Sequence, residues 1–174
     1  MRLAVVTAVL LLVCILDTVT ARFRFYPAIQ CKSYPDKPCG GGWSRIGAKH
    51  CAKFFWSKKT FNDAQDYCRN SQGGHLVSIH NEAEMMNVYC LISHARRYLR
   101  NSFWIGLRKT GNQHVGWRFG YTDGSEFKYT RWHRGEPNNS DGKEHCVESN
   151  YKNWGYWNDI RCSDKKYFVC AKNM

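Results

Sequence analysis

The sequence lacks the short signatures that would mark several common classes of enzyme and metalloprotein. Neither the G-x-S-x-G motif of serine hydrolases nor the H-E-x-x-H motif of zinc proteases occurs in it. No two C-x-x-C steps are present, which makes a structural zinc site a poor explanation for the cysteines. The chain also has no internal repeats and no low-complexity segments. These absences favour one ordinary folded domain that binds a ligand, and we do not expect an enzyme.

Long apolar runs are also scarce. The apolar stretch from Leu3 to Leu16 follows Arg2 and precedes the small residues Val19-Thr20-Ala21. It is shorter than the roughly 20 residues that span a bilayer, so it predicts a secretory signal peptide and not an anchor. We therefore expect a signal peptide at residues 1–21, an N-terminal extension at residues 22–38, a folded domain at residues 39–174, no transmembrane segment and a secreted, extracellular product.

Acidic residues are few relative to basic ones. The chain has 14 Asp and Glu against 26 Lys and Arg, giving a formal net charge of +12. A basic surface of this kind is either simply soluble or attracted to anionic microbial cell walls, sulfated glycans or acidic membranes. Nucleic acid is disfavoured as a partner because export is predicted and no recognisable binding motif is present.

Cysteine is abundant. Cleavage after Ala21 would remove Cys14 and leave an even number of cysteines, at positions 31, 39, 51, 68, 90, 146, 162 and 170. An even count in an exported chain predicts disulfides, but eight cysteines permit 105 pairings. The residues alone do not choose among these pairings.

Local patterns predict a mixed α+β domain. Thr60 is a favourable helix N-cap and Gly73-Gly74 would end that helix. Asn81 followed by Glu84 resembles a capping box at the start of a second helix, which would end near His94. The predicted strands are His75–Ile79, Phe103–Leu107, Val115–Trp117, Trp157–Asp159 and Tyr167–Cys170. From Trp117 to Tyr156 we expect a long irregular region, which in a compact domain points to function.

Hard oxygen donors gather within that region. The stretch from Arg134 to Asp159 holds the donors Glu136, Asn138, Glu144, Asn158 and Asp159. Calcium prefers carboxylate and amide oxygens, usually six to eight at about 2.3–2.6 Å. The stretch therefore predicts a Ca²⁺ site.

The combination of several motifs resembles the C-type lectin domain. The motifs are Trp104-Ile105-Gly106-Leu107, Glu136-Pro137-Asn138 and Trp157-Asn158-Asp159, arranged around the cysteines 68, 146, 162 and 170. The resemblance covers nearly all of residues 39–174. It implies a C-type lectin-like fold of two helices flanking small antiparallel sheets, with a long calcium-binding loop. It also implies the disulfides Cys68–Cys170 and Cys146–Cys162, and the long form of the family adds a bridge that matches Cys39–Cys51.

Cys31 and Cys90 are left over by this scheme. They would bridge to each other within the chain, or one of them would join two subunits into a homo-oligomer. We adopt Cys31–Cys90 as the working assignment.

The same resemblance assigns the metal ligands and the sugar contacts. Glu136, Asn138, Glu144, Asn158 and Asp159 match the family's carbohydrate-binding calcium site, and Pro137 is expected to be cis. The order Glu-Pro-Asn is the one that the family associates with mannose, N-acetylglucosamine and fucose. Mannose and N-acetylglucosamine present equatorial 3- and 4-hydroxyls, and fucose can present an equivalent pair. The resemblance thus implies a lectin that recognises microbial or cell-surface glycans in innate defence. The family's auxiliary calcium site is less well matched, because Arg108-Lys109 and Asn139 stand where acidic residues would help it.

Other interpretations compete for these residues. Asn138-Asn139-Ser140 is the only Asn-x-Ser/Thr sequence in the chain, and a glycan on Asn138 would block both ion and ligand. Glu136 and Glu144 could be imagined as a glycosidase pair, but a shared cation would keep both ionised. His133 and His145 flank the stretch without an evident nucleophile. The alternative function keeps the fold: a basic antimicrobial or biomineral-matrix protein that binds anionic surfaces, with sugar binding secondary.

Overall fold

The computed structural model describes Cys31 and residues 39–93, 101–112, 116–152 and 154–174. Residues 36–174 form one compact unit. The predicted signal peptide lies outside the described residues, as does all of the predicted extension except Cys31. Among the helices formed by the described residues, none is long and apolar enough to cross a membrane.

Helix α3, Phe61–Gln72, has the ends that its sequence predicts. The hydroxyl of Thr60 accepts a hydrogen bond from the Asp63 N–H at 3.3 Å, which satisfies one of the free donors of the first turn. Gly73 closes the helix with φ 68°, a left-handed conformation that glycine adopts without steric cost. Phe61, Ala64 and Cys68 form the buried face.

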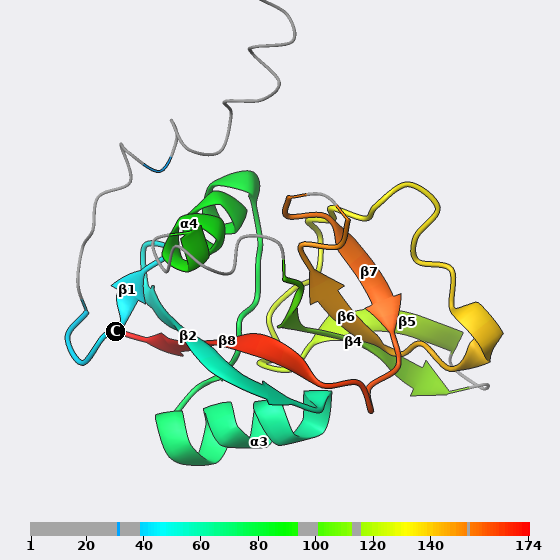
Figure 1. Ribbon diagram of the computed structural model, residues 1–174, viewed down its shortest axis with the longest axis horizontal. Coiled ribbons are helices and arrows are strands. Elements are labelled where there is room, and N and C mark those ends of the chain that lie inside the picture. Colours follow the sequence, from blue (N-terminus) through cyan, green and yellow to red (C-terminus); the bar gives the residue numbers. More distant parts are fainter. Residues whose placement is uncertain (1–30, 32–38, 94–100, 113–115, 153) are drawn as a thin grey trace, which may run out of the picture. The chain divides into compact units, whose positions relative to one another are not determined.

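Helix α4, Glu82–Ser93, also begins as predicted. The Asn81 side chain accepts from the Glu84 N–H at 2.9 Å. The Glu84 carboxylate reaches back to the N–H of His80 at 2.9 Å, one residue earlier than in a standard capping box. In Figure 1, α3 and α4 lie on opposite sides of the paired strands β2 and β8.

The strands form one connected sheet. They are β1 Ser44–Arg45, β2 His50–Lys59, β3 His75–Leu76, β4 Phe103–Asn112, β5 Gly116–Tyr121, β6 Cys146–Ser149, β7 Trp157–Ile160 and β8 Lys166–Asn173. Their order is β1-β2-β8-β4-β6-β7, with β3 on β8 and β5 on β4. Only the β4–β8 pair is parallel among these pairings. The predicted α+β class and the two flanking helices are confirmed, and the expected small antiparallel sheets are joined through β4 and β8.

Two element predictions differ from the structure. The strand predicted at His75–Ile79 is regular only as far as Leu76, although the Val77 N–H still bonds the Val169 carbonyl at 2.9 Å. Strand β6 lies inside the region predicted to be irregular. Its four residues, including the polar Glu148 and Ser149, are all buried, so it lacks the alternation that marks a half-buried strand.

Three disulfides fix the unit. The structure contains Cys39–Cys51, Cys68–Cys170 and Cys146–Cys162, the three pairs that the family resemblance implies. Cys68–Cys170 spans 102 residues and lies in an apolar cluster with Trp104 and Phe168. Cys31 and Cys90 are each disulfide-bonded as well. Their predicted pairing with each other stays a prediction.

Candidate functional site

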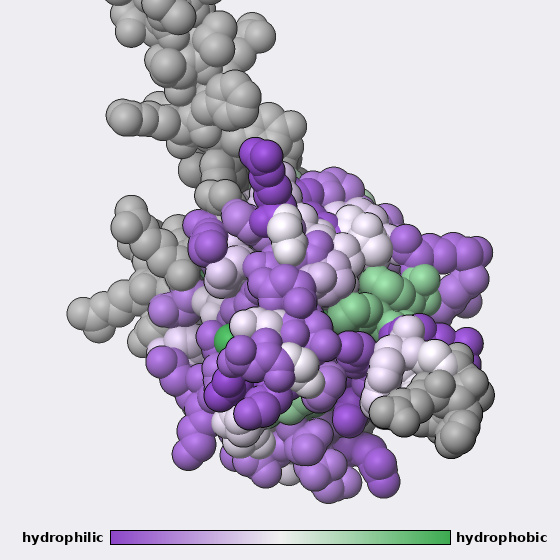
Figure 2. All heavy atoms as spheres, turned by 90° about the vertical axis from the view of Figure 1, so that its right-hand side faces the viewer, coloured by the Kyte–Doolittle hydropathy of each residue, from purple (hydrophilic) through white to green (hydrophobic). Residues whose placement is uncertain are grey.

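The residues predicted to bind a cation lie on β7 and on the chain between β5 and β6. That chain is irregular apart from the short 3₁₀ helix η1, Ser140–Gly142. It is tied to β7 by two backbone hydrogen bonds of Trp157, one with Arg131 at 2.8 Å and one with His133 at 2.9 Å. Figure 2, which views the right-hand side of Figure 1, shows this face covered mainly by hydrophilic residues.

Asp159 is the anchor of the loop. Its carboxylate oxygens accept hydrogen bonds from the backbone N–H groups of Asn138 and Asn139, each at 2.9 Å. Asp159 is 1% exposed, so this charge is held almost wholly out of water. A buried carboxylate requires partners of this kind, and the two amides fix Asn138 directly against β7.

Glu144 and Asn138 meet at the start of η1. The Ser140 N–H donates to the Glu144 carboxylate and to the Asn138 side-chain oxygen, each at 2.8 Å. The Glu144 N–H in turn lies 3.3 Å from the side-chain oxygen of Asn139. The loop thus folds so that oxygens of two predicted ligands share one backbone donor.

The Glu136 carboxyl is influenced by the negative charges of two other predicted ligands, Asp159 and Glu144. Glu136 forms a cis peptide bond with Pro137, as the resemblance implies. Its Oε2 atom is buried and has no hydrogen-bond partner among the described residues. Burial, followed by the negative charges of Asp159 and Glu144, raises the pKa of the Glu136 carboxyl above its ordinary value. Such a group favours a positive charge at this position.

Asn158 is oriented by Glu148, a residue that the sequence patterns did not single out. Its side-chain amide donates to Glu148 Oε1 at 3.0 Å, and both residues are buried. The other Glu148 oxygen lies 2.8 Å from the Lys166 ammonium, so the carboxylate is paired as well as buried. Because one amide N–H of Asn158 is held by Glu148, its side-chain oxygen has a fixed direction.

The predicted ligands are neighbours, but their carboxylates do not form a ready-made cluster. Within the described ranges, no three His, Cys, Asp or Glu side chains stand together in a way that could hold a metal ion. The loop N–H groups occupy oxygens of Asp159 and Glu144 instead. A carboxylate oxygen has a second lone pair, so these hydrogen bonds leave coordination sites available.

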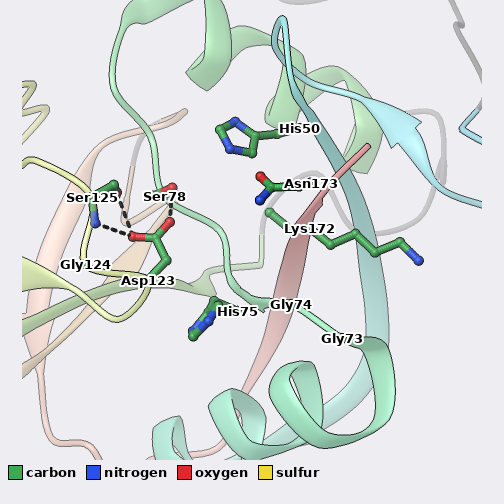
Figure 3. A pocket seen from close by; sticks show the side chains of 11 residues that line it. His50, Gly73, Gly74, His75, Ser78, Asp123, Gly124, Ser125, Lys172 and Asn173 are labelled. Atoms are coloured by element: carbon green, nitrogen blue, oxygen red, sulfur yellow. Dashed lines mark hydrogen bonds between the residues drawn. The ribbon is translucent and has the colours of Figure 1, made fainter.

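A pocket of about 470 Å³ lies in another part of the unit (Figure 3). Its lining includes His50, His75 and Asp123 and none of the predicted ligands. The Asp123 carboxylate is already engaged by Ser125 at 2.6 and 2.9 Å and by Ser78 at 2.6 Å. One ring nitrogen of His75 is bonded to Gln65 at 2.9 Å. These groups support local structure and do not converge on a ligand.

Comparison with known proteins places the chain in a family. Residues 57–172 match the lectin C-type domain. The chain belongs to the C-type lectin family. It is 37% identical over 145 residues to C-type isolectin Sp-CL4 of Scorpaena plumieri, covering 83% of this chain and 96% of the relative. It is 36% identical over 138 residues to the galactose-specific lectin nattectin of Thalassophryne nattereri, covering 78% and 81% of the two chains. The solved structure of human lithostathine superposes with a TM-score of 0.68 at 30% identity, covering 78% of this chain and all of that one.

Two residues of this C-type lectin were missed by sequence reasoning. Glu148 has no local signal, because its role depends on a cross-strand position opposite Asn158. The charge of Lys152 partly offsets the rise in the pKa of Glu136, which places this charge close to the predicted cation site. The flanking histidines that sequence reasoning noted are packed against aromatic rings: His133 lies 5.4 Å from Tyr151, and His145 lies 6.1 Å from Trp117.

Proposed function

We propose that this C-type lectin binds carbohydrate in a calcium-dependent manner through Glu136, Asn138, Glu144, Asn158 and Asp159. The observation that carries the proposal is the Glu136 carboxylate. Its Oε2 atom is buried without a hydrogen-bond partner in the described part of the chain, and its pKa is raised by burial and by two neighbouring carboxylates. A cation among these groups would compensate both features, and carboxylate and amide oxygens suit calcium.

The five side chains would divide the work of holding ion and sugar. Calcium, when bound, would offer coordination positions to two neighbouring hydroxyls of a pyranose. The carboxylates of Glu136 and Glu144 accept hydrogen bonds from such hydroxyls, and the amides of Asn138 and Asn158 donate them. Glu148 accepts a hydrogen bond from the Asn158 side-chain amide at 3.0 Å and thereby fixes the orientation of that amide. The arrangement selects for the geometry of two adjacent hydroxyls.

For specificity we propose sugars with equatorial 3- and 4-hydroxyls, namely mannose, N-acetylglucosamine or an equivalent pair on fucose. Support comes from the order Glu136-Pro137-Asn138 in the sequence. A relative of similar identity is named a galactose-specific lectin, so membership of the family does not decide the specificity. Galactose is therefore the informative competitor.

The proposed setting of this activity is supported by features of the sequence. We infer secretion from the predicted signal peptide, and recognition of microbial or cell-surface glycans from the lectin site combined with the net charge of +12.

A mannan resin tests the proposal. The protein is loaded in calcium and eluted separately with EDTA, mannose and galactose. We expect EDTA and mannose to elute it and galactose to be ineffective. Elution by galactose alone would overturn the specificity, and retention in both EDTA and mannose would overturn the lectin mechanism.

Site variants provide the matched control. Asn158→Ala and Asp159→Ala should abolish retention while preserving the disulfides and the far-ultraviolet circular dichroism spectrum. Asp141→Ala removes an exposed acid of η1, paired with Arg161 at 3.1 Å, and should be retained like the wild type.

A further inference from the structure

Arg131 lies at a junction of three parts of the fold. Its guanidinium is paired with the carboxylate of Glu82, the first residue of α4. It also lies over two aromatic rings, with its Cζ atom 4.8 Å from the ring centroid of Trp154 and 5.0 Å from that of Tyr156. Distances below about 6 Å are those of cation–π contacts. Arg131 therefore joins α4, the turn between β6 and β7, and the segment that leads to Glu136.

The cation is largely out of water and its partner is ionised. The Arg131 side chain is 19% exposed. The Tyr129 hydroxyl donates to the same Glu82 carboxylate. Burial raises the pKa of the Glu82 carboxyl, but hydrogen bonds from Tyr129 and Arg131 outweigh it, so the pKa lies below its ordinary value. An ion pair of this kind is stronger than one between two fully exposed side chains.

Backbone hydrogen bonds lead from Arg131 to the proposed calcium ligands. The Trp157 N–H donates to the Arg131 carbonyl at 2.8 Å, and the His133 N–H donates to the Trp157 carbonyl at 2.9 Å. The Glu136 N–H then donates to the His133 carbonyl at 2.9 Å. Trp157 directly precedes Asn158 in the sequence. The position of the Arg131 backbone is thus linked to that of Glu136 and to that of Asn158.

The turn before β7 packs against Arg131 and α4 together. A Cβ atom at Gly155 would lie 3.3 Å from Arg131 Nε and 3.5 Å from the terminal methyl of Met85 in α4. The Trp154 ring meets the ring of Tyr89, also in α4, with centroids 4.5 Å apart and an interplanar angle of 73°. Strand β7, which follows this turn, carries two of the proposed ligands. The junction therefore supports the site from both of its chain segments.

We propose that Arg131 is a positioning residue for calcium binding, which fixes the segment before Glu136 against β7 through its pairing with Glu82. Ligands that are held together before the ion arrives bind it more tightly, because less ordering is left to be done on binding. Arg131 is not itself a proposed ligand and acts through the backbone. This proposal rests on the proposed function for the ion. It goes beyond that function by making calcium affinity depend on α4, a helix that supplies none of the five ligands.

Calcium calorimetry on Arg131→Gln, Glu82→Gln and the double variant tests the proposal. Each single change should weaken calcium binding by roughly threefold to tenfold, less than the 10–100-fold typical for a direct partner of a metal ligand. The double variant should bind calcium as Arg131→Gln does, because both changes break the same ion pair. Arg131→Lys keeps the charge and should bind calcium more tightly than Arg131→Gln. Losses that add fully in the double variant would overturn the proposal.

Two controls separate positioning from a general loss of stability. Lys128→Gln breaks an ion pair with Glu126 in which the lysine is 78% exposed, and it should bind calcium as the wild type does. Thr60→Ala removes the N-cap of α3, so it should lower the melting temperature and leave calcium affinity within about twofold. If Thr60→Ala weakens calcium binding as much as Arg131→Gln does, the effect is one of stability and the proposal fails.

Amide hydrogen exchange in EDTA gives a readout that does not depend on calcium. Arg131→Gln should speed the exchange of the Trp157, His133 and Glu136 N–H groups by at least about threefold, because their segment opens locally more often. The Leu76 N–H of β3 should exchange at the wild-type rate. Unchanged exchange at all three groups would overturn the positioning role. If the wild type does not bind calcium, the proposed function fails, and these exchange rates alone decide whether Arg131 orders the segment.

Discussion

Asn158 and Glu148 face each other across strands β7 and β6, and the Asn158 amide donates to the Glu148 carboxylate at 3.0 Å. Glu148 is 1% exposed and its other oxygen is paired with Lys166 at 2.8 Å. A buried acid of this kind is costly unless both oxygens are used. Here one oxygen orients a proposed calcium ligand and the other joins β6 to β8, so the site and the sheet share one charged group.

Glu148 is not itself a proposed calcium ligand, but replacing it should weaken calcium binding because it orients Asn158. Glu148→Ala frees the Asn158 amide and leaves Lys166 without its carboxylate partner. Loss of an outer partner of a metal ligand typically costs about 10–100-fold in affinity. We expect a loss of that order by calcium calorimetry, together with a lower melting temperature.

The control for that variant is Glu126→Ala, which removes an exposed acid paired with Lys128 at 2.9 Å. An exposed ion pair contributes roughly 0–1 kcal/mol, so both calcium affinity and melting temperature should stay near the wild-type values. Unchanged affinity in Glu148→Ala would show that Asn158 needs no support from β6.

Gly106 should be irreplaceable for steric reasons. A Cβ atom at this position would lie 2.5 Å from the Leu76 carbonyl oxygen and 3.0 Å from the Thr122 hydroxyl. Gly106→Ala must therefore displace backbone, and we expect a loss of about 3 kcal/mol in the free energy of unfolding. Denaturation in urea measures it. Gly120→Ala, where the nearest atom is 3.4 Å away, should cost far less, and equal losses would contradict the steric argument.

The parts of the fold that sequence could predict are those with local causes. Thr60 and Gly73 set the ends of α3 through contacts within the helix itself, so both were visible in the sequence. Strand β6 was not, because its pairing with β4 and β7 and the burial of both its faces, with Val147 in one apolar cluster and Cys146 in another, depend on residues distant in the chain. The parallel contact between β4 and β8 likewise joins residues far apart in the chain, such as Trp104 and Phe168.

The same division applies to the site. A ligand set could be proposed from the sequence because Glu136-Pro137-Asn138 and Trp157-Asn158-Asp159 are contiguous motifs that resemble those of a known family. The sequence did not indicate that Asp159 would hold the loop through backbone N–H groups of Asn138 and Asn139, since that contact depends on the folded path of the loop. Trp117 and His145 are brought together by the β4–β5 hairpin and the chain before β6, and neither residue predicts the other.

Removing calcium should lower stability as well as sugar binding. Any ligand that binds only the folded state stabilises it, by about 2.7 kcal/mol when present at 100 times its dissociation constant. We therefore expect a higher melting temperature in millimolar calcium than in EDTA. Asp159→Asn should lose this difference, because it removes the central charge of the site. A calcium shift that persists in Asp159→Asn would place the ion elsewhere.

Acid should weaken the fold at Asp123, which lines a pocket that includes none of the proposed calcium ligands. Burial raises the pKa of the Asp123 carboxyl, but hydrogen bonds from Ser125 and Ser78 outweigh it, so the pKa lies below its ordinary value. A carboxyl with a depressed folded pKa contributes stability above its unfolded pKa of about 3.9 and loses it as the pH falls through the folded value. The free energy of unfolding of the wild type should thus exceed that of Asp123→Asn at pH 7. The difference should shrink below about pH 4, as measured by urea denaturation at several pH values. A difference that stays constant down to pH 2 would show that Asp123 acts through its shape and not through its charge.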